Sequence, residues 1–70
     1  MTIYDIGQTI RSERKKQNLR QDELAAAAGV GLRFLVEVER GKETAQIGKV
    51  LDVLSALGCK ISITRPESST

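Results

Sequence analysis

Histidine and tryptophan are absent from the 70 residues, and cysteine, proline, methionine, tyrosine and phenylalanine occur once each. Without histidine, the usual zinc spacings that combine cysteine with histidine cannot form, and the single cysteine, Cys59, allows no disulfide within one chain. The chain also lacks a histidine base and a glycine-rich phosphate loop, so most catalytic arrangements are missing. We therefore expect no metal, no cofactor, no enzymatic activity and a reducing compartment.

Long apolar runs are missing as well. No stretch approaches the ~18 residues needed to cross a bilayer, and residues 1–5 lack the charged start and apolar middle of a signal peptide. We expect a cytoplasmic protein that does not enter a membrane. Seventy residues make one domain near the lower size at which a single core suffices, so we expect dimerisation to add stability.

Two short amphipathic segments lie in the middle of the chain. In residues 21–28, Leu24 shares one stripe at helical spacing with small alanines, and in residues 32–40 the apolar residues around Leu35 again gather on one side. Between them, residues 29–31 read Gly-Val-Gly, and glycine ends a helix at little cost. A turn of this length joins the two helices of a helix-turn-helix, whose second helix enters a DNA groove.

A charged residue interrupts the apolar stripe of two predicted helices. In residues 5–17, Ile6, Ile10 and Arg14 fall at i, i+4 and i+8, and in residues 32–40 Glu39 lies beside the apolar stripe. Isolated burial of either charge would be very unfavourable. We therefore predict that Arg14 and Glu39 form a structural ion pair, and not a phosphate contact and a catalytic acid.

A fourth helix is predicted from an N-cap at Thr44 to about residue 57, followed by the terminating Gly58. We expect a close helix crossing to explain Gly48, which destabilises a helix by roughly 1 kcal/mol relative to alanine. The apolar residues of this segment predict one wide core face, formed by Ile47, Val50, Leu51, Leu54 and Leu57.

After this helix the period of the pattern changes to two. Residues 60–64 alternate polar with β-branched apolar side chains, which is typical of a strand: Lys60, Ile61, Ser62, Ile63 and Thr64. A single strand cannot satisfy its own backbone groups, and no other segment offers a comparable strand. We predict that it pairs antiparallel with the same strand of a second copy, giving a homodimer. Pro66 ends the strand, and residues 66–70 are too polar to become ordered.

Residues 5–58 resemble the Xre or phage-repressor class of helix-turn-helix domains. The resemblance rests on Gln21, the Leu-Ala pair at residues 24–25, Gly29 and the Glu-Arg-Gly-Lys run at residues 39–42. It implies an all-α, compact four-helix, lambda-repressor-like domain over residues 1–58, with a dimerisation strand over residues 59–65. The implied function is that of a repressor of transcription that binds double-stranded operator DNA with palindromic half-sites.

Within that class, the chain is similar to the small HipB-like antitoxins. This narrower resemblance rests on Arg33-Phe34, on the Gly-Lys-Glu-Thr turn at residues 41–44 and on the segment after the fourth helix. It implies repression of the protein's own operon, binding of a HipA-like kinase toxin and dimerisation through the C-terminal strand. Two alternatives stay open, namely a repressor without a toxin and a module of the same fold that mainly binds a protein.

The predicted second helix of the unit carries the candidate base contacts. Arg33 can donate two hydrogen bonds to guanine, and Leu32 and Val36 can contact a thymine methyl group, although both, and Val36 above all, also fit ordinary core packing. Glu37 could accept a hydrogen bond from cytosine, be repelled by phosphates, or brace Arg33 or Arg40.

Phosphate contacts are expected from residues that lie before that helix in the chain and from residues at its end. The resemblance assigns a DNA-backbone contact to Gln21, where a helix N-terminus also offers free N–H groups, although a merely polar first-turn residue would look the same. Gly31 allows a close backbone approach, and Arg40 and Lys42 lie where cations and backbone N–H groups would face a phosphate. The net charge is only +2, but basic residues also crowd the segment that leads into the unit: Arg11, Arg14, Lys15, Lys16 and Arg20. For Lys15 and Lys16 a solvated helix face is an equal alternative.

Overall fold

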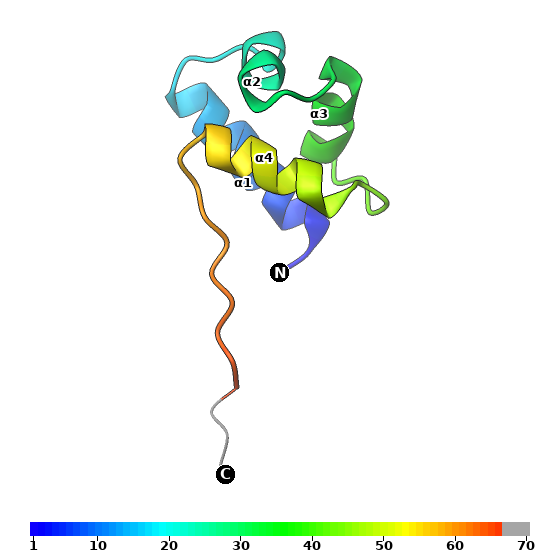
Figure 1. The fold of residues 1–70 in the computed structure, drawn as a ribbon, viewed down its shortest axis with the longest axis vertical. Helices are drawn as coiled ribbons and strands as arrows, with labels where there is room; N and C mark the ends of the chain where they lie inside the picture. Colours follow the sequence, from blue (N-terminus) through cyan, green and yellow to red (C-terminus); the bar gives the residue numbers. More distant parts are fainter. Residues whose placement is uncertain (67–70) are drawn as a thin grey trace.

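Four α-helices build the protein, in a computed structural model that describes residues 1–66. They are α1 (Ile3–Lys16), α2 (Gln21–Ala28), α3 (Leu32–Glu39) and α4 (Ile47–Ala56). Figure 1 shows α4 lying across α1, with α2 and α3 at one end of the helical body and residues 59–66 extending away from it. The predicted compact, all-α, four-helix domain is confirmed.

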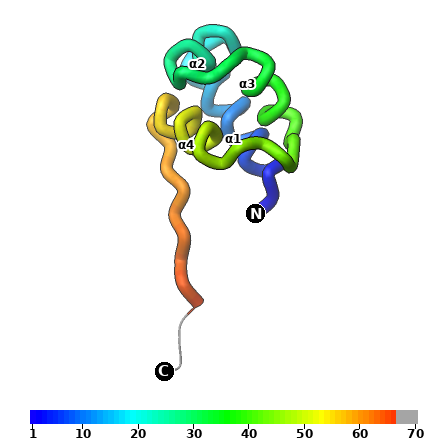
Figure 2. Tube along the Cα trace, turned by 45° about the vertical axis from the view of Figure 1, so that its right-hand side comes forward, coloured from blue at the N-terminus to red at the C-terminus, as the bar shows by residue number. Residues whose placement is uncertain are grey.

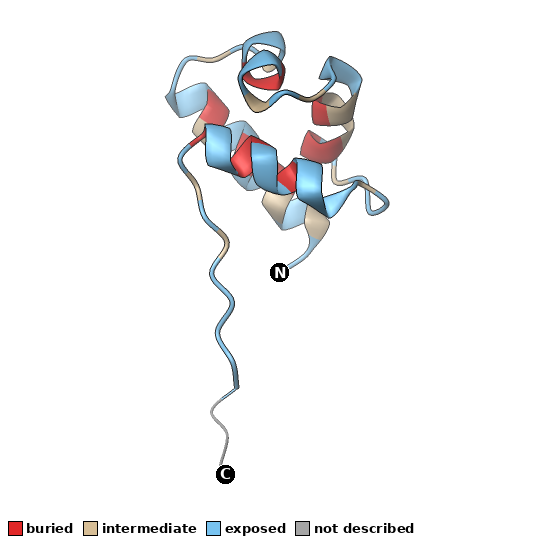
Figure 3. Ribbon diagram, viewed as in Figure 1, coloured by how far each residue is buried: buried red, intermediate tan, exposed pale blue. Residues whose placement is uncertain are grey.

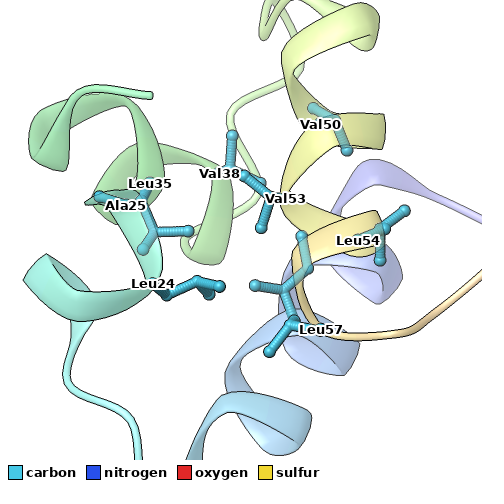
Figure 4. Packing of buried hydrophobic residues seen from close by; sticks show 9 residues of the cluster. Leu24, Ala25, Leu35, Val38, Val50, Val53, Leu54 and Leu57 are labelled. Carbon is cyan, nitrogen blue, oxygen red and sulfur yellow. The ribbon is translucent and has the colours of Figure 1, made fainter. Parts of the chain in front are cut away.

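One small hydrophobic core joins the four helices. It contains nine buried side chains: Ile10, Leu24, Ala25, Leu35, Val38, Val50, Val53, Leu54 and Leu57. Figure 4 shows Leu24 of α2 facing Leu57 and Val38 of α3 lying beside Val53 of α4, and Figure 3 shows that the outward faces of the helices stay exposed. Burying one Val or Leu side chain contributes about 1.5–3 kcal/mol, so this core holds α2 and α3 against the two longer helices.

Helix α1 begins two residues before the predicted start at Asp5. Thr2 is its N-cap, and the Thr2 hydroxyl accepts a hydrogen bond from the backbone N–H of Asp5 at 3.1 Å. In return, the Asp5 carboxylate accepts the backbone N–H of Thr2 at 3.0 Å. This reciprocal capping box satisfies two N–H groups that a helix start leaves unpaired, and it extends the helix to Ile3.

Helix α4 begins later than predicted, and Thr44 is not its N-cap. The N–H of Ala45 donates to the carbonyl of Lys42, which closes a turn, and Gln46 caps the helix without a side-chain hydrogen bond. Two of the predicted core residues are also wrong, because Ile47 is 60% exposed and Leu51 is 45% exposed. Val53 takes their place in the core, since the buried stripe follows Val50, Val53, Leu54 and Leu57 at helical spacing.

The close helix crossing occurs at Gly7 and not at Gly48. A Cβ atom at Gly7 would clash with the carbonyl oxygen of Val38, so only glycine lets α1 approach α3 this closely. At Gly48 a Cβ atom would meet nothing within 4 Å. The expected reason for Gly48 is therefore wrong, and nothing in the structure explains this glycine.

Residues 59–66 are extended and, within the part of the chain that the structure describes, pair with no other segment. Cys59 and Ile61 are partly buried against the core, whereas Ile63 is 88% exposed. Figure 2 shows the segment leaving the helical body after α4. The structure contains one chain, so the predicted strand between two copies is not shown. Residues 67–70, most of the predicted disordered tail, lie outside the described residues. Among the described helices, none has both the length and the apolar character to cross a membrane.

Candidate nucleic-acid interface

The turn between α2 and α3 has the predicted position and length. Helix α2 ends at Ala28 and is capped by Gly29, whose φ of 71° is left-handed, and the N–H of Val30 donates to the carbonyl of Ala25 at 3.0 Å. Glycine adopts this conformation without the steric penalty of a side chain. Gly31 is the extended N-cap of α3, which runs from Leu32 to Glu39 and so ends one residue before the predicted Arg40.

Helix α3 has a buried side and an outward side. Leu35, Val38 and Glu39 are buried. On the outward side, the Arg33 side chain is 92% exposed and Leu32 is 48% exposed. Val36 and Glu37 are half-buried at the boundary between the two sides. An exposed arginine flanked by an apolar side chain can reach the edges of bases in a major groove.

The Arg14 guanidinium of α1 holds the Glu39 carboxylate at the C-terminal end of α3. Arg14 Nε donates to Glu39 Oε2 at 2.7 Å, and Nη2 donates to Oε1 at 3.1 Å. A third hydrogen bond, from Arg14 Nη1 to the carbonyl of Leu19 at 2.8 Å, reaches the connection between α1 and α2. Both residues are buried, at 9% and 4% exposure, so each charge depends on the other. These bonds tie α1, the α1–α2 connection and α3 together.

Gln21 lies at the start of α2, but its side chain is turned toward the ion pair. Its Nε2 donates to Glu39 Oε1 at 3.1 Å, and the residue is half-buried. An amide nitrogen has two hydrogens, so one donor stays available for a phosphate. Some of the backbone N–H groups at the start of α2 already have acceptors. The N–H of Arg20 donates to Glu23, and the N–H of Glu23 donates to Asp22.

Glu37 is bound to two cations of the surface. Lys42 Nζ donates to Glu37 Oε1 at 3.0 Å, and Arg33 Nε lies 3.7 Å from Oε2. The hydrogen bond from Lys42 holds the pKa of the Glu37 carboxyl below its usual range, although partial desolvation opposes this shift. In this geometry the residue braces Arg33 and Lys42, and not Arg40.

Three backbone N–H groups at the end of α3 are already hydrogen-bonded within the protein. The N–H groups of Arg40, Gly41 and Lys42 all donate to carbonyls of α3, at 2.9–3.2 Å. The end of the helix uses these three donors itself, so a phosphate beside Arg40 and Lys42 would be bound by their side chains, and this contact stays a prediction. Both side chains are exposed, but the Lys42 ammonium is bound to Glu37, whereas Arg40 forms no ion pair within residues 1–66.

Most of the basic run in residues 11–20 does not belong to one site. Arg20 pairs with Asp22 at 3.1 Å, and this hydrogen bond keeps the pKa of the Asp22 carboxyl below its usual range. Lys16 lies 3.6 Å from Glu13. Arg11 differs, because it lines the same surface hollow as Gln21. Sequence reasoning grouped Arg11 with its neighbours and gave it no contact of its own, since only the packing of α1 against α3 places it there.

Two comparisons with known proteins agree with this geometry. Residues 10–63 match a family model described as helix-turn-helix. The chain is also 68% identical over 65 residues to an uncharacterized HTH-type transcriptional regulator of Sinorhizobium fredii, and the match covers 93% of this chain and 86% of that relative. The family match includes the whole of α2, the turn and α3, together with the start of the extended segment after α4.

Proposed function

This chain belongs to the Xre-type helix-turn-helix family of transcriptional regulators, and on that premise we propose that it is a homodimeric repressor that recognises a specific operator. The observation that carries the proposal is the exposed side of α3, where Arg33 projects from a helix that the core and the Arg14–Glu39 pair hold firmly. A helix that reads bases needs this combination of free side chains and a rigid position.

Three side chains of α3 supply the base contacts of the proposed complex. Arg33 donates to the O6 and N7 atoms of a guanine, and Leu32, which is 48% exposed, contacts a thymine methyl group. Val36 is half-buried, so it contributes at the edge of the interface. Glu37 acts mainly through Arg33, since it already lies 3.7 Å from the guanidinium.

The remaining proposed contacts go to the DNA backbone. Gln21 uses its second amide hydrogen, and Arg40 and Lys42 use their exposed cations. Gly31 is exposed at the start of α3 with open space around it, which allows a phosphate to approach the main chain. Such contacts position the protein on any duplex, whereas the contacts of α3 select the sequence.

Dimerisation is proposed through residues 60–64. Their extended backbone and the exposed Ile63 suit pairing with the same segment of a second copy. Helix α4 is the second candidate, because Ile47 and Leu51 are large apolar side chains on its exposed side. A two-fold dimer would present two copies of α3 about 34 Å apart to a palindromic site.

The narrower role that we propose is that of an antitoxin that represses its own operon and binds a HipA-like kinase toxin in the cytoplasm. Its support is the resemblance to HipB-like proteins at Arg33-Phe34, at residues 41–44 and after α4. The competing possibility is a module that mainly binds a protein, which the modest net charge of +2 and the Glu37 carboxylate on the DNA-facing side would favour.

Gel-shift titrations with the DNA upstream of the gene, compared with scrambled duplex, test the proposed function. Arg33→Ala should weaken operator binding by roughly 1–3 kcal/mol and relax the preference at one base pair in each half-site. Lys42→Ala, the control, should weaken all sequences alike and lower the salt dependence. A wild-type protein without salt-dependent affinity for duplex DNA would favour the protein-binding module instead.

A further inference from the structure

A polar hollow opens between α1, α2 and α3, beside the ion pair. Its volume is about 270 Å³, and six residues line it: Arg11, Arg14, Gln21, Val36, Glu39 and Arg40. A water molecule takes only ~30 Å³ in the liquid, so a tetrahedral group such as phosphate has room to enter. The lining brings residues of three helices and of the turn after α3 to one place.

The charge of this lining is positive. Three arginines and one glutamate give the lining a formal charge of +2. The Glu39 carboxylate is neutralised by Arg14, to which it is bound at 2.7 Å. Arg11 and Arg40 are exposed, and within residues 1–66 neither forms an ion pair. Two cations at the rim, with no carboxylate of their own, form a local field that attracts an anion.

Glu39 also fixes the orientation of the Gln21 amide. An ionised carboxylate only accepts hydrogen bonds, so Gln21 must turn its Nε2 and not its carbonyl oxygen toward Glu39 Oε1, at 3.1 Å. The second hydrogen of the same nitrogen is then held in a defined direction. Because Arg14 binds both Glu39 oxygens, the carboxylate itself cannot swing away.

We propose that this hollow receives one phosphodiester group of the DNA backbone. Arg11 and Arg40 supply the cations, the Gln21 amide supplies a neutral donor, and Glu39 acts as a positioning residue for that amide. The proposal rests on the proposed function and adds Arg11, from α1, to the interface. Since Val36 of α3 lines the same hollow, a phosphate bound here would fix the distance between the backbone and the reading helix.

The test compares Arg11→Ala with Lys49→Ala, a control at an exposed cation of α4 that does not line the hollow. One phosphate contact contributes about 0.9 to the slope of log affinity against log salt. Because Arg40 faces the same phosphate, Arg11→Ala removes at most this contribution. The ratio of wild-type to Arg11→Ala affinity should therefore shrink, by no more than about eightfold, when salt rises tenfold, on operator and scrambled duplex alike. Lys49→Ala should keep the wild-type slope.

A second measurement addresses the role of Glu39. Gln21→Ala should weaken DNA binding in the wild-type background and have a clearly smaller effect in the Arg14→Met/Glu39→Met background, where the amide has lost its fixed acceptor. An unchanged fold-loss in both backgrounds would overturn the positioning role.

The outcomes separate the two levels of the proposal. Absence of DNA binding by the wild-type protein would remove the proposed function itself. Normal wild-type binding with the same salt slope for Arg11→Ala would overturn only the phosphate site. Inorganic phosphate at constant ionic strength should compete with DNA no better than chloride does. Stronger competition would show a site for the free anion and would also overturn the assignment to the DNA backbone.

Discussion

Arg14→Met should destabilise the domain by about 3–5 kcal/mol, because it leaves the Glu39 carboxylate buried without a cation. Glu39 is only 4% exposed, so water can replace little of what the guanidinium donates to it at 2.7 and 3.1 Å. The change also removes the hydrogen bond to the carbonyl of Leu19. A domain of this length has about 3.5–10 kcal/mol of stability, at 0.05–0.15 kcal/mol per residue. The expected loss is a large part of it.

Replacing both charges should recover much of this loss. In Arg14→Met/Glu39→Met no buried charge remains, and such apolar replacements are often neutral or stabilising by about 1–4 kcal/mol. Against this gain, the Leu19 carbonyl and the Gln21 amide lose their partners, at roughly 1 kcal/mol each. We expect the double variant to lie within about 2 kcal/mol of the wild type and well above Arg14→Met.

Thermal and urea unfolding, followed by far-UV circular dichroism, provide the measurement. All variants are compared at one protein concentration, because the stability of a dimer depends on it. For a domain of this size, 1 kcal/mol moves the Tm by about 4–8 °C, so Arg14→Met should lose at least about 12 °C. Small and additive losses in the two single variants, Arg14→Met and Glu39→Met, would show that both side chains are solvated, and would refute the reasoning from burial.

Three further predictions concern other parts of the molecule. Gly7→Ala should destabilise by about 1–3 kcal/mol, because a Cβ atom clashes with the backbone of α3, whereas Gly48→Ala, which faces open space, should stabilise by up to about 1 kcal/mol in the same melts. Ile63→Pro should leave the helices folded but shift the protein toward monomer in sedimentation runs, and a variant that stays dimeric would assign the interface to α4. The Glu37 carboxyl should titrate by NMR below its ordinary pKa and move upward in Lys42→Ala. Because the pKa of Glu37 is lowered, its stabilising contribution is present above the ordinary pKa of a glutamate and is lost as the pH falls through the lowered pKa. An unshifted titration would contradict the contacts of Glu37 with its cations.

The sequence was most informative where local chemistry decides the structure. The bounds of α2 agree with the prediction because Gly29 ends the helix at a position where a left-handed φ of 71° is required. The start of α1 is also decided by local chemistry, because the capping box lies within residues 2–5. The prediction of a start at Asp5 did not take this capping box into account. The error at Thr44 came from the opposite case, in which a turn closed by backbone hydrogen bonds prevailed over a good capping residue.

Features that depend on packing between helices could not be read with the same certainty. Periodicity placed Ile47 and Leu51 on an apolar face, but it does not say where a neighbouring helix stops covering that face. The contact of Gln21 with Glu39 joins residues 18 positions apart, and the hollow that includes Arg11 requires three helices at once. In the same way, the need for glycine at residue 7 arises from the backbone of α3.

The two sides of α3 also bear on how this protein could acquire a new target. The folding of the domain depends on Leu35, Val38 and Glu39, which are buried, whereas Leu32 and Arg33 are exposed and contribute little to the core. Substitutions on the outward side should therefore change the preferred operator with little effect on stability. Natural variation and laboratory selection can act on these positions separately from the scaffold, so a library restricted to them should yield folded proteins with altered base preferences.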